Sequence, residues 1–214
     1  MTDEERKYLL TRRALLIGGA AALVAACSRG DRNEAASTAS PASGTASGTR
    51  LTPTPSCDDG DEPTIEQTEG PYFTPDSPEK SDFTGDVSGG TKMVLTGTVL
   101  STSCEPLERA LLDFWHANDS GEYDNEGYNL RGHMFTDTNG TYRLQTIMPG
   151  IYIGRTKHIH VKVQAPNGPI LTTQLYFPDE AGNASDGIYD QALLMDVTDS
   201  GDTKNAGFTF VVET

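Results

Sequence analysis

Residues 154–163 read Gly-Arg-Thr-Lys-His-Ile-His-Val-Lys-Val. From His158 onward the run is apolar and rich in β-branched residues, which predicts a strand. Side chains alternate along a strand, so His158 and His160 project from the same face, with Cα atoms about 6.6 Å apart. Two imidazoles on one rigid strand can share a metal ion, although the pattern also fits a histidine pair on a solvated face.

The chain from residue 56 to residue 214 is predicted to form one all-β domain, a β-sandwich. Short apolar runs are bounded by Gly, Pro and Asp, and no long stretch has helical periodicity. The Asn139-Gly140 pair favours a tight hairpin turn. The predicted strands are Met93–Leu100, Leu111–His116, Tyr142–Gln145, His158–Gln164, Ile170–Phe177, Ala192–Val197 and Phe208–Val212.

Two tyrosines precede the histidine pair in turn-like contexts, Tyr123 after Gly121-Glu122 and Tyr152 after Pro149-Gly150-Ile151. A tyrosine has a pKa near 10, so it becomes a good ligand only where a strong Lewis acid keeps it ionised. Two phenolates with one hydroxide neutralise a trivalent ion, and two neutral histidines complete five-coordination. Ferric iron fits this set, whereas zinc prefers Cys, His and carboxylate. Tyrosine is also a common strand and core residue.

Several motifs follow one another between about residues 64 and 178. They are Thr68-Glu69-Gly70-Pro71-Tyr72-Phe73, Leu112–Asn118 with Gly121-Glu122-Tyr123, Leu130-Arg131-Gly132, Thr136–Arg143, Thr146–Tyr152, Arg155–His160 and Thr172–Phe177. In this order they resemble the intradiol ring-cleavage dioxygenases of the protocatechuate and catechol dioxygenase kind, and among them the exported single-domain members. The resemblance implies the same β-sandwich fold and a non-haem Fe(III) cofactor.

The resemblance also implies the metal ligands, which are Tyr123, Tyr152, His158 and His160. Tyr123 is expected to stay bound. Tyr152 is expected to leave when the substrate chelates the metal, and its phenolate then takes a catechol proton.

Other positions match the family's substrate site. Arg155 is expected to stabilise negative charge that builds on the ring, and Gln174 to hydrogen-bond near the substrate or metal. Gly70, Pro71 and Tyr72 resemble the segment that lines one wall of the pocket.

Four further residues have structural readings. Trp115 is predicted to pack in the core, and His116 and His133 to be structural or exposed. Lys157 stands where the family more usually has a small residue or proline. It either adds positive charge at the pocket mouth or points to solvent.

The N-terminus reads as an export signal over residues 1–27. Arg12-Arg13 precede an apolar run that is too short to span a membrane comfortably, and Val24-Ala25-Ala26-Cys27 resembles a lipobox with Cys27 as the lipidated residue. The alternative is an ordinary cleaved signal. Residues 28–55 lack apolar periodicity and are predicted to be a disordered linker. The expected location is therefore the bacterial cell envelope, with the lipoprotein anchored at the outer side of a membrane.

The chain has three cysteines. With Cys27 acylated, Cys57 and Cys104 remain as a pair in an exported protein, where oxidising conditions favour a disulfide. The alternative is two separate thiols.

The formal net charge of −15 argues against a nucleic-acid partner and against broad attraction of anionic substrates. The expected partners are a catechol-type aromatic substrate and O2, with membrane contact only through the lipid anchor and a homo-oligomer left open. The helical region with which catechol enzymes dimerise has no counterpart in the motifs of this chain.

The expected function is therefore cleavage of a catechol-type ring by O2 between its two hydroxylated carbons. The alternatives are a non-catalytic cell-surface β-sandwich binding module, and a scavenger of iron or aromatic compounds with little turnover.

Overall fold

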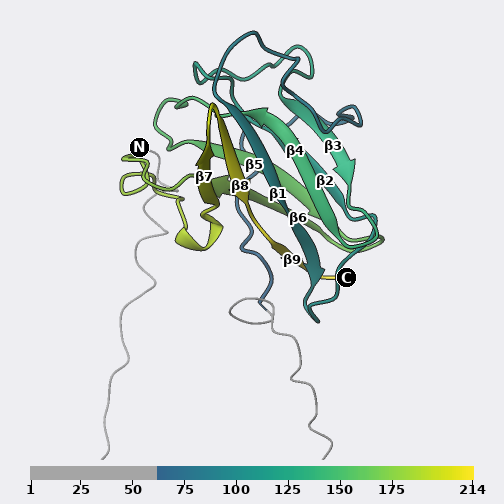
Figure 1. Ribbon diagram of the computed structural model, residues 1–214. Helices are drawn as coiled ribbons and strands as arrows, with labels where there is room; N and C mark the ends of the chain where they lie inside the picture. Colours follow the sequence, from purple (N-terminus) through teal and green to yellow (C-terminus); the bar gives the residue numbers. More distant parts are fainter. Residues whose placement is uncertain (1–61) are drawn as a thin grey trace, which may run out of the picture. The chain divides into compact units, whose positions relative to one another are not determined.

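Two β-sheets pack face to face in residues 62–214, the part of the chain that the computed structural model describes (Figure 1). One sheet has the order β4 (Thr141–Ile147), β1 (Lys92–Ser101), β8 (Thr203–Gly207), β7 (Asp196–Ser200), with β9 (Phe210–Val212) pairing with β1. The other has the order β3 (Arg131–Phe135), β2 (Leu111–Trp115), β5 (His158–Gln164), β6 (Ile170–Tyr176). The predicted all-β sandwich is confirmed. The predicted signal and linker, with Cys27 and Cys57, lie outside the described residues.

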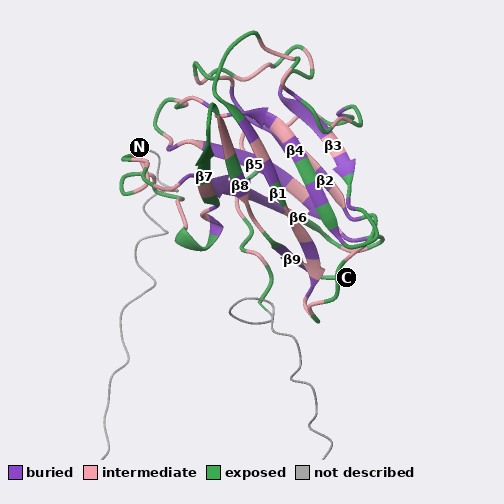
Figure 2. Ribbon diagram, in the orientation of Figure 1, coloured by how far each residue is buried: buried purple, intermediate pink, exposed green. Residues whose placement is uncertain are grey.

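Alternation along the strands separates the core from the site. In β5, Ile159, Val161 and Val163 are fully buried and belong to the hydrophobic core between the sheets (Figure 2). His158 and His160 occupy the alternate positions and therefore the opposite face of the sheet. Burial of the apolar face stabilises the sandwich at about 25 cal/mol per Å² of apolar surface, which fixes the side to which the histidines point.

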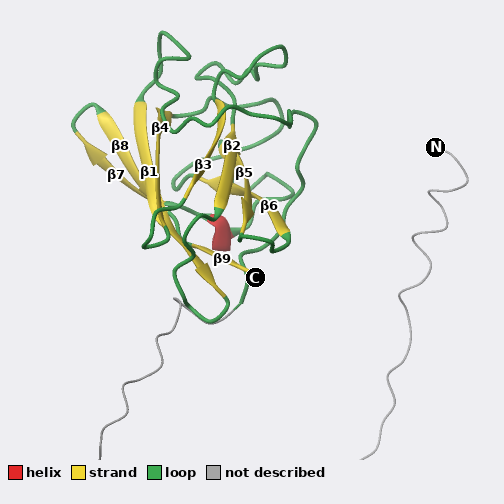
Figure 3. Ribbon diagram, turned by 90° about the vertical axis from the view of Figure 1, so that its right-hand side faces the viewer, coloured by secondary structure: helices red, strands yellow, loops and turns green. Residues whose placement is uncertain are grey.

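The strand predictions hold for six of the seven runs and fail for one. Residues 192–197 were expected to form a strand, but the 3-10 helix η1 (Gln191–Leu193) comes first and β7 starts only at Asp196 (Figure 3). Its N-cap Asp190 accepts a hydrogen bond from the backbone N–H of Ala192, which favours the helical turn.

The hairpin prediction is also wrong. Asn139-Gly140 does form a turn, with Gly140 at φ +71°. The strands on either side are β3 and β4, however, and they belong to different sheets. The turn therefore carries the chain from one layer to the other.

Residues 62–73 run beside β6 and deliver the Gly70–Tyr72 segment to the histidines. The Gln67 N–H donates to the Thr172 carbonyl at 2.8 Å, and Gln174 Nε2 donates to the Thr68 carbonyl at 2.9 Å. Between residues 62 and 214, no helix has the length and apolar character that a membrane crossing needs.

Candidate metal centre

The two histidines of β5 point their Nε2 atoms at each other. Both side chains are buried, and the Nε2 atoms are 3.1 Å apart. His158 Nδ1 lies 2.7 Å from the carbonyl oxygen of Thr156, so this nitrogen carries the proton and donates it. The lone pair of His158 is therefore on Nε2, the atom that faces His160.

Two tyrosines from separate loops join the histidines. The Tyr123 hydroxyl lies 3.1 Å from His158 Nε2, and the Tyr152 ring meets the Tyr123 ring edge-on at 5.8 Å. The four predicted ligands are thus gathered in one cluster, although they come from two loops and one strand.

Burial sets the charge of this cluster. It lowers the pKa of His158 to about 4 and places that of His160 well below its usual value, so both imidazoles are neutral at neutral pH. Burial also raises the pKa of Tyr123 far above 10, and the charges of Arg155 and Arg131 offset only part of this rise. A phenolate at Tyr123 therefore needs a strongly charged cation beside it.

The donor set fits ferric iron better than zinc. Within residues 62–214 there is no group of three or more His, Cys, Asp and Glu side chains arranged for a metal ion. The cluster instead offers two neutral imidazole nitrogens and phenol oxygens. The phenols can supply negative charge to a trivalent ion but are unusual for zinc.

Tyr72 completes an aromatic lining over the donors. Its ring stacks on Tyr123 at 4.5 Å, and its hydroxyl lies 2.6 Å from the Tyr152 hydroxyl. That hydrogen bond raises the pKa of Tyr72, so its hydroxyl stays protonated. Gly70, in the same segment, lies close to His160, because a Cβ there would lie 3.4 Å from His160 Cε1. Pro71 links the two.

Arg155 and Gln174 lie at the edge of the cluster. Arg155 Nη2 donates to Gln174 Oε1 at 2.7 Å, and Gln174 is fully buried opposite His160 in the β5–β6 register. Both predicted residues are therefore next to the histidines. Lys157 lies apart from them, with its Nζ paired to Glu180 at 2.8 Å.

The sequence reading did not assign a role to Arg131, which the structure buries beside the tyrosines. Its Nε donates to the Asp124 carbonyl at 2.8 Å, and its Nη1 donates to the Tyr72 carbonyl. One guanidinium thus ties together the two loops that carry Tyr123 and Tyr72. An arginine inside the Leu130-Arg131-Gly132 motif was the available signal.

Trp115 is buried as predicted, but it lies on the outer face of β2, away from the space between the sheets. Its indole stacks on the His160 ring at 4.9 Å with an interplanar angle of 9°. It therefore holds the plane of a predicted ligand. His116 is buried with both ring nitrogens hydrogen-bonded, and His133 contacts Ser77, so both have the structural role expected of them.

Backbone contacts fix the distance between the two tyrosine loops. The Gly150 N–H donates to the Asn118 carbonyl at 2.7 Å, and a Cβ on Gly150 would lie 2.4 Å from the Asp119 carbonyl oxygen. Gly121, at φ +84°, packs against the Ile151 carbonyl in the same way. Only glycine allows the loops to approach so closely.

Known proteins are similar to this chain in sequence. A family model described as Dioxygenase matches residues 68–212. The chain is 28% identical over 185 residues to a chlorocatechol 1,2-dioxygenase of Cupriavidus pinatubonensis, covering 72% of this chain and 70% of that protein. It is 30% identical over 136 residues to a catechol 1,2-dioxygenase of Acinetobacter baylyi, a match that spans 50% of this chain and only 44% of that protein.

Solved structures are also similar to this chain. The dioxygenase domain of a dioxygenase carbohydrate-binding protein fusion from Streptomyces sp. SirexAA-E is 48% identical, with a TM-score of 0.70. The match covers 72% of this chain and 99% of that one. A 3-chlorocatechol 1,2-dioxygenase of Rhodococcus opacus is 27% identical, with a TM-score of 0.65 and coverage of 73% and 75%.

Proposed function

Because this chain belongs to the intradiol ring-cleavage dioxygenase family, we propose that it is a non-haem iron(III) enzyme that cleaves a catechol-type ring with O2 between the two hydroxylated carbons. The observation that carries the proposal is the convergence of Tyr123, His158 and His160 on one point, with donor atoms 3.1 Å apart. Tyr152 lies against this group.

Tyr123, Tyr152, His158 and His160 would hold the iron. Ferric iron bound there would act as a Lewis acid that draws electron density from the catechol oxygens and prepares the ring for reaction with O2. The neutral state of both histidines suits this role, because a ligating imidazole must be unprotonated.

Tyr152 is the proton acceptor in this proposal. Its oxygen takes one proton from a catechol hydroxyl, which favours binding of the substrate as an anion. The Tyr72 hydroxyl lies 2.6 Å from the same oxygen, and the hydrogen bond between the two hydroxyls holds the Tyr152 oxygen in place.

Arg155 supplies positive charge at the edge of the site. Its guanidinium stays ionised and stabilises negative charge that develops on the ring carbons during the reaction with O2. Gln174 accepts from Arg155 and donates to the Thr68 carbonyl, so it links the arginine to the pocket wall.

The paired cations favour an uncharged catechol as substrate. Lys157 and Lys162 have carboxylate partners in Glu180 and Glu69. A ring carboxylate would have to compete with these pairs, so catechol is expected to be turned over faster than protocatechuate. A higher kcat/KM for protocatechuate would reject this preference.

Metal analysis and oxygen uptake test the function. Purified protein loaded with iron should be coloured by tyrosinate-to-iron charge transfer and should consume O2 when catechol is added. Stoichiometric zinc in a colourless protein would reject the iron site. Iron-loaded protein that binds catechol but takes up no O2 would point to a binding module or a scavenger.

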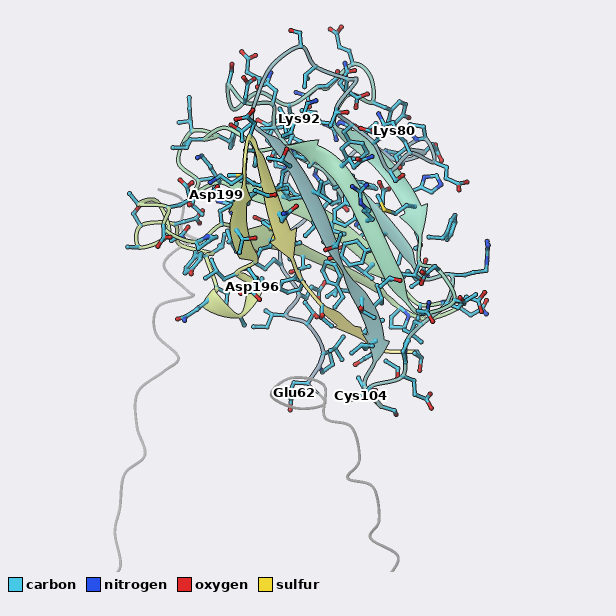
Figure 4. The ribbon with its side chains drawn as sticks, in the orientation of Figure 1. Glu62, Lys80, Lys92, Cys104, Asp196 and Asp199 are labelled. Atoms are coloured by element: carbon cyan, nitrogen blue, oxygen red, sulfur yellow. The ribbon has the colours of Figure 1, made fainter. Side chains whose placement is uncertain are left out.

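We also propose that the protein is a cell-envelope lipoprotein, anchored through Cys27 and with a disulfide between Cys57 and Cys104. The chain path supports the pairing. Thr64 hydrogen-bonds to Val211, whose neighbour Val212 pairs with Ser101 at the end of β1. The described part of the chain therefore starts, at Glu62, close to the turn that carries Cys104. Both Glu62 and Cys104 are labelled at the lower end of the domain in Figure 4.

A further inference from the structure

The three residues before His158 are each held by a side chain of one loop, residues 178–190. These pairs are Arg155 Nε with Asp186 Oδ2 at 2.8 Å, Thr156 Oγ1 with Asn183 Oδ1 at 2.6 Å, and Lys157 Nζ with Glu180 Oε1 at 2.8 Å. Gly182 allows the close approach, because a Cβ there would lie 3.0 Å from Thr156 Oγ1. The loop is thus fastened residue by residue to the segment that enters β5.

The Asp186 carboxylate is a buried contact in this set. Its side chain is 2% exposed, and it accepts hydrogen bonds from the Thr156 N–H at 2.9 Å and the Ile188 N–H at 3.1 Å as well as from Arg155. Burial alone would raise the pKa of Asp186, but these hydrogen bonds outweigh it and lower the pKa. The carboxylate is therefore ionised and geometrically fixed at neutral pH.

Arg155 is held on two of its three nitrogens. Nε binds Asp186, and Nη2 donates to Gln174 Oε1 at 2.7 Å, with the Tyr176 hydroxyl at 3.4 Å. Among residues 62–214, Nη1 has no hydrogen-bond partner, and the side chain remains 21% exposed. Asp186 and Gln174 fix the guanidinium plane through Nε and Nη2, while Nη1 stays available.

We propose that Asp186 is a positioning residue that holds the Arg155 guanidinium in one plane, with Nη1 left for the substrate. The proposal rests on the function proposed above. An unrestrained arginine must lose side-chain freedom when it meets a transition state, and this loss raises the barrier. Asp186 removes that freedom in advance. It also holds the Thr156 backbone, whose carbonyl accepts the proton of His158 Nδ1.

The test compares Asp186→Asn with Asp179→Asn in iron-loaded protein. Asp179 lies in the same loop, is exposed, and has a positive φ of 60° that asparagine tolerates, so the control makes the same change of charge. Asp186→Asn should slow the reaction of bound catechol with O2 by roughly 10- to 100-fold, since a misplaced catalytic group loses rate on this scale. Anaerobic catechol binding should change by less than about threefold, because the group acts mainly in the transition state. Asp179→Asn should behave as wild type.

A double-mutant cycle shows whether Asp186 acts through Arg155. Arg155→Leu with Asp186→Asn should be no slower than Arg155→Leu alone, because the arginine that Asp186 positions is already gone. If the two losses multiply, Asp186 does not act through Arg155 and the proposal is wrong. Asp186→Glu, which keeps the charge but moves it by one methylene, should lie between wild type and Asp186→Asn.

A readout independent of turnover separates this proposal from the proposed function. In wild-type protein the Arg155 Nε–H should give a resolved NMR signal that exchanges slowly with water, and Asp186→Asn or Asp186→Glu should speed that exchange. A wild-type protein that takes up no O2 would reject the function, whereas an Nε–H that exchanges equally fast in wild type and in both variants would reject the positioning role.

Discussion

His160 contacts several other parts of the site. Its ring stacks on Trp115, its Nε2 faces His158, and Gly70 passes over its Cε1 edge. His160→Ala should therefore abolish stoichiometric iron binding, because water replaces a fixed donor poorly.

Tyr152→Phe should keep much of its iron and lose turnover, since it deletes the proton acceptor. Metal analysis and oxygen uptake measure the two effects.

His133→Gln is the control for the loss of a histidine. His133 lies on β3 against Ser77, so this substitution should leave the iron content unchanged. Wild-type turnover in Tyr152→Phe would remove Tyr152 from its role as the base.

The buried His116 predicts how stability depends on pH. Burial lowers its pKa from 6.5 to about 4, so between these values the unfolded chain binds a proton that the folded protein does not. The free energy of unfolding should therefore fall as pH drops from about 6.5 to 4, by up to roughly 3 kcal/mol for this one group. Urea unfolding of iron-free wild type and His116→Gln, repeated across this pH range, measures the difference. A variant with the same pH slope as wild type would contradict the assignment.

At the scale of elements, the spacing of the two tyrosine loops depends on Gly150. Gly150→Ala places a methyl group against the Asp119 carbonyl and should cost about 1–3 kcal/mol of stability as well as iron affinity. Gly85→Ala is the matched control, because a Cβ there meets nothing within 4 Å. Thermal unfolding and iron titration of both variants provide the measurement. Equal iron affinity in the two would show that loop spacing does not position Tyr123 and Tyr152.

The strands also show how much of the fold the sequence predicts. β5 was predicted with the bounds that it has, because its apolar residues alternate along a buried strand. β8 (Thr203–Gly207) and β3 (Arg131–Phe135) were missed, because their sequences TKNAG and RGHMF have no clear apolar alternation. They become strands through pairing with β1 and β2, which is a tertiary effect.

The same limit applies to the site. Strand periodicity places His158 and His160 together, and the family resemblance supplies Tyr123 and Tyr152. Sequence spacing could not show that Asp186, 31 residues beyond Arg155, binds its guanidinium, because loop contacts follow from packing. Ordered motifs predict the candidate ligands, whereas the residues that hold them become visible only in three dimensions.

At the scale of the whole molecule, the cysteines test the proposed location. Mass mapping of exported protein without reduction should find Cys57 joined to Cys104 and a diacylglyceryl group on Cys27. Oxidising conditions outside the cytoplasm favour the disulfide. Expression without residues 1–27 is the control and should give protein without lipid. Free thiols at Cys57 and Cys104 in the exported protein would contradict the pairing.

The reaction proposed for the folded domain is ring cleavage with O2 between the two hydroxylated carbons. Its most direct test is a reaction of iron-loaded protein with catechol under isotopically labelled oxygen gas, followed by mass spectrometry of the product. The expected product is a cis,cis-muconate-type diacid that contains both atoms of one O2 molecule. A product cleaved outside the two hydroxyl groups, or one without label, would contradict it.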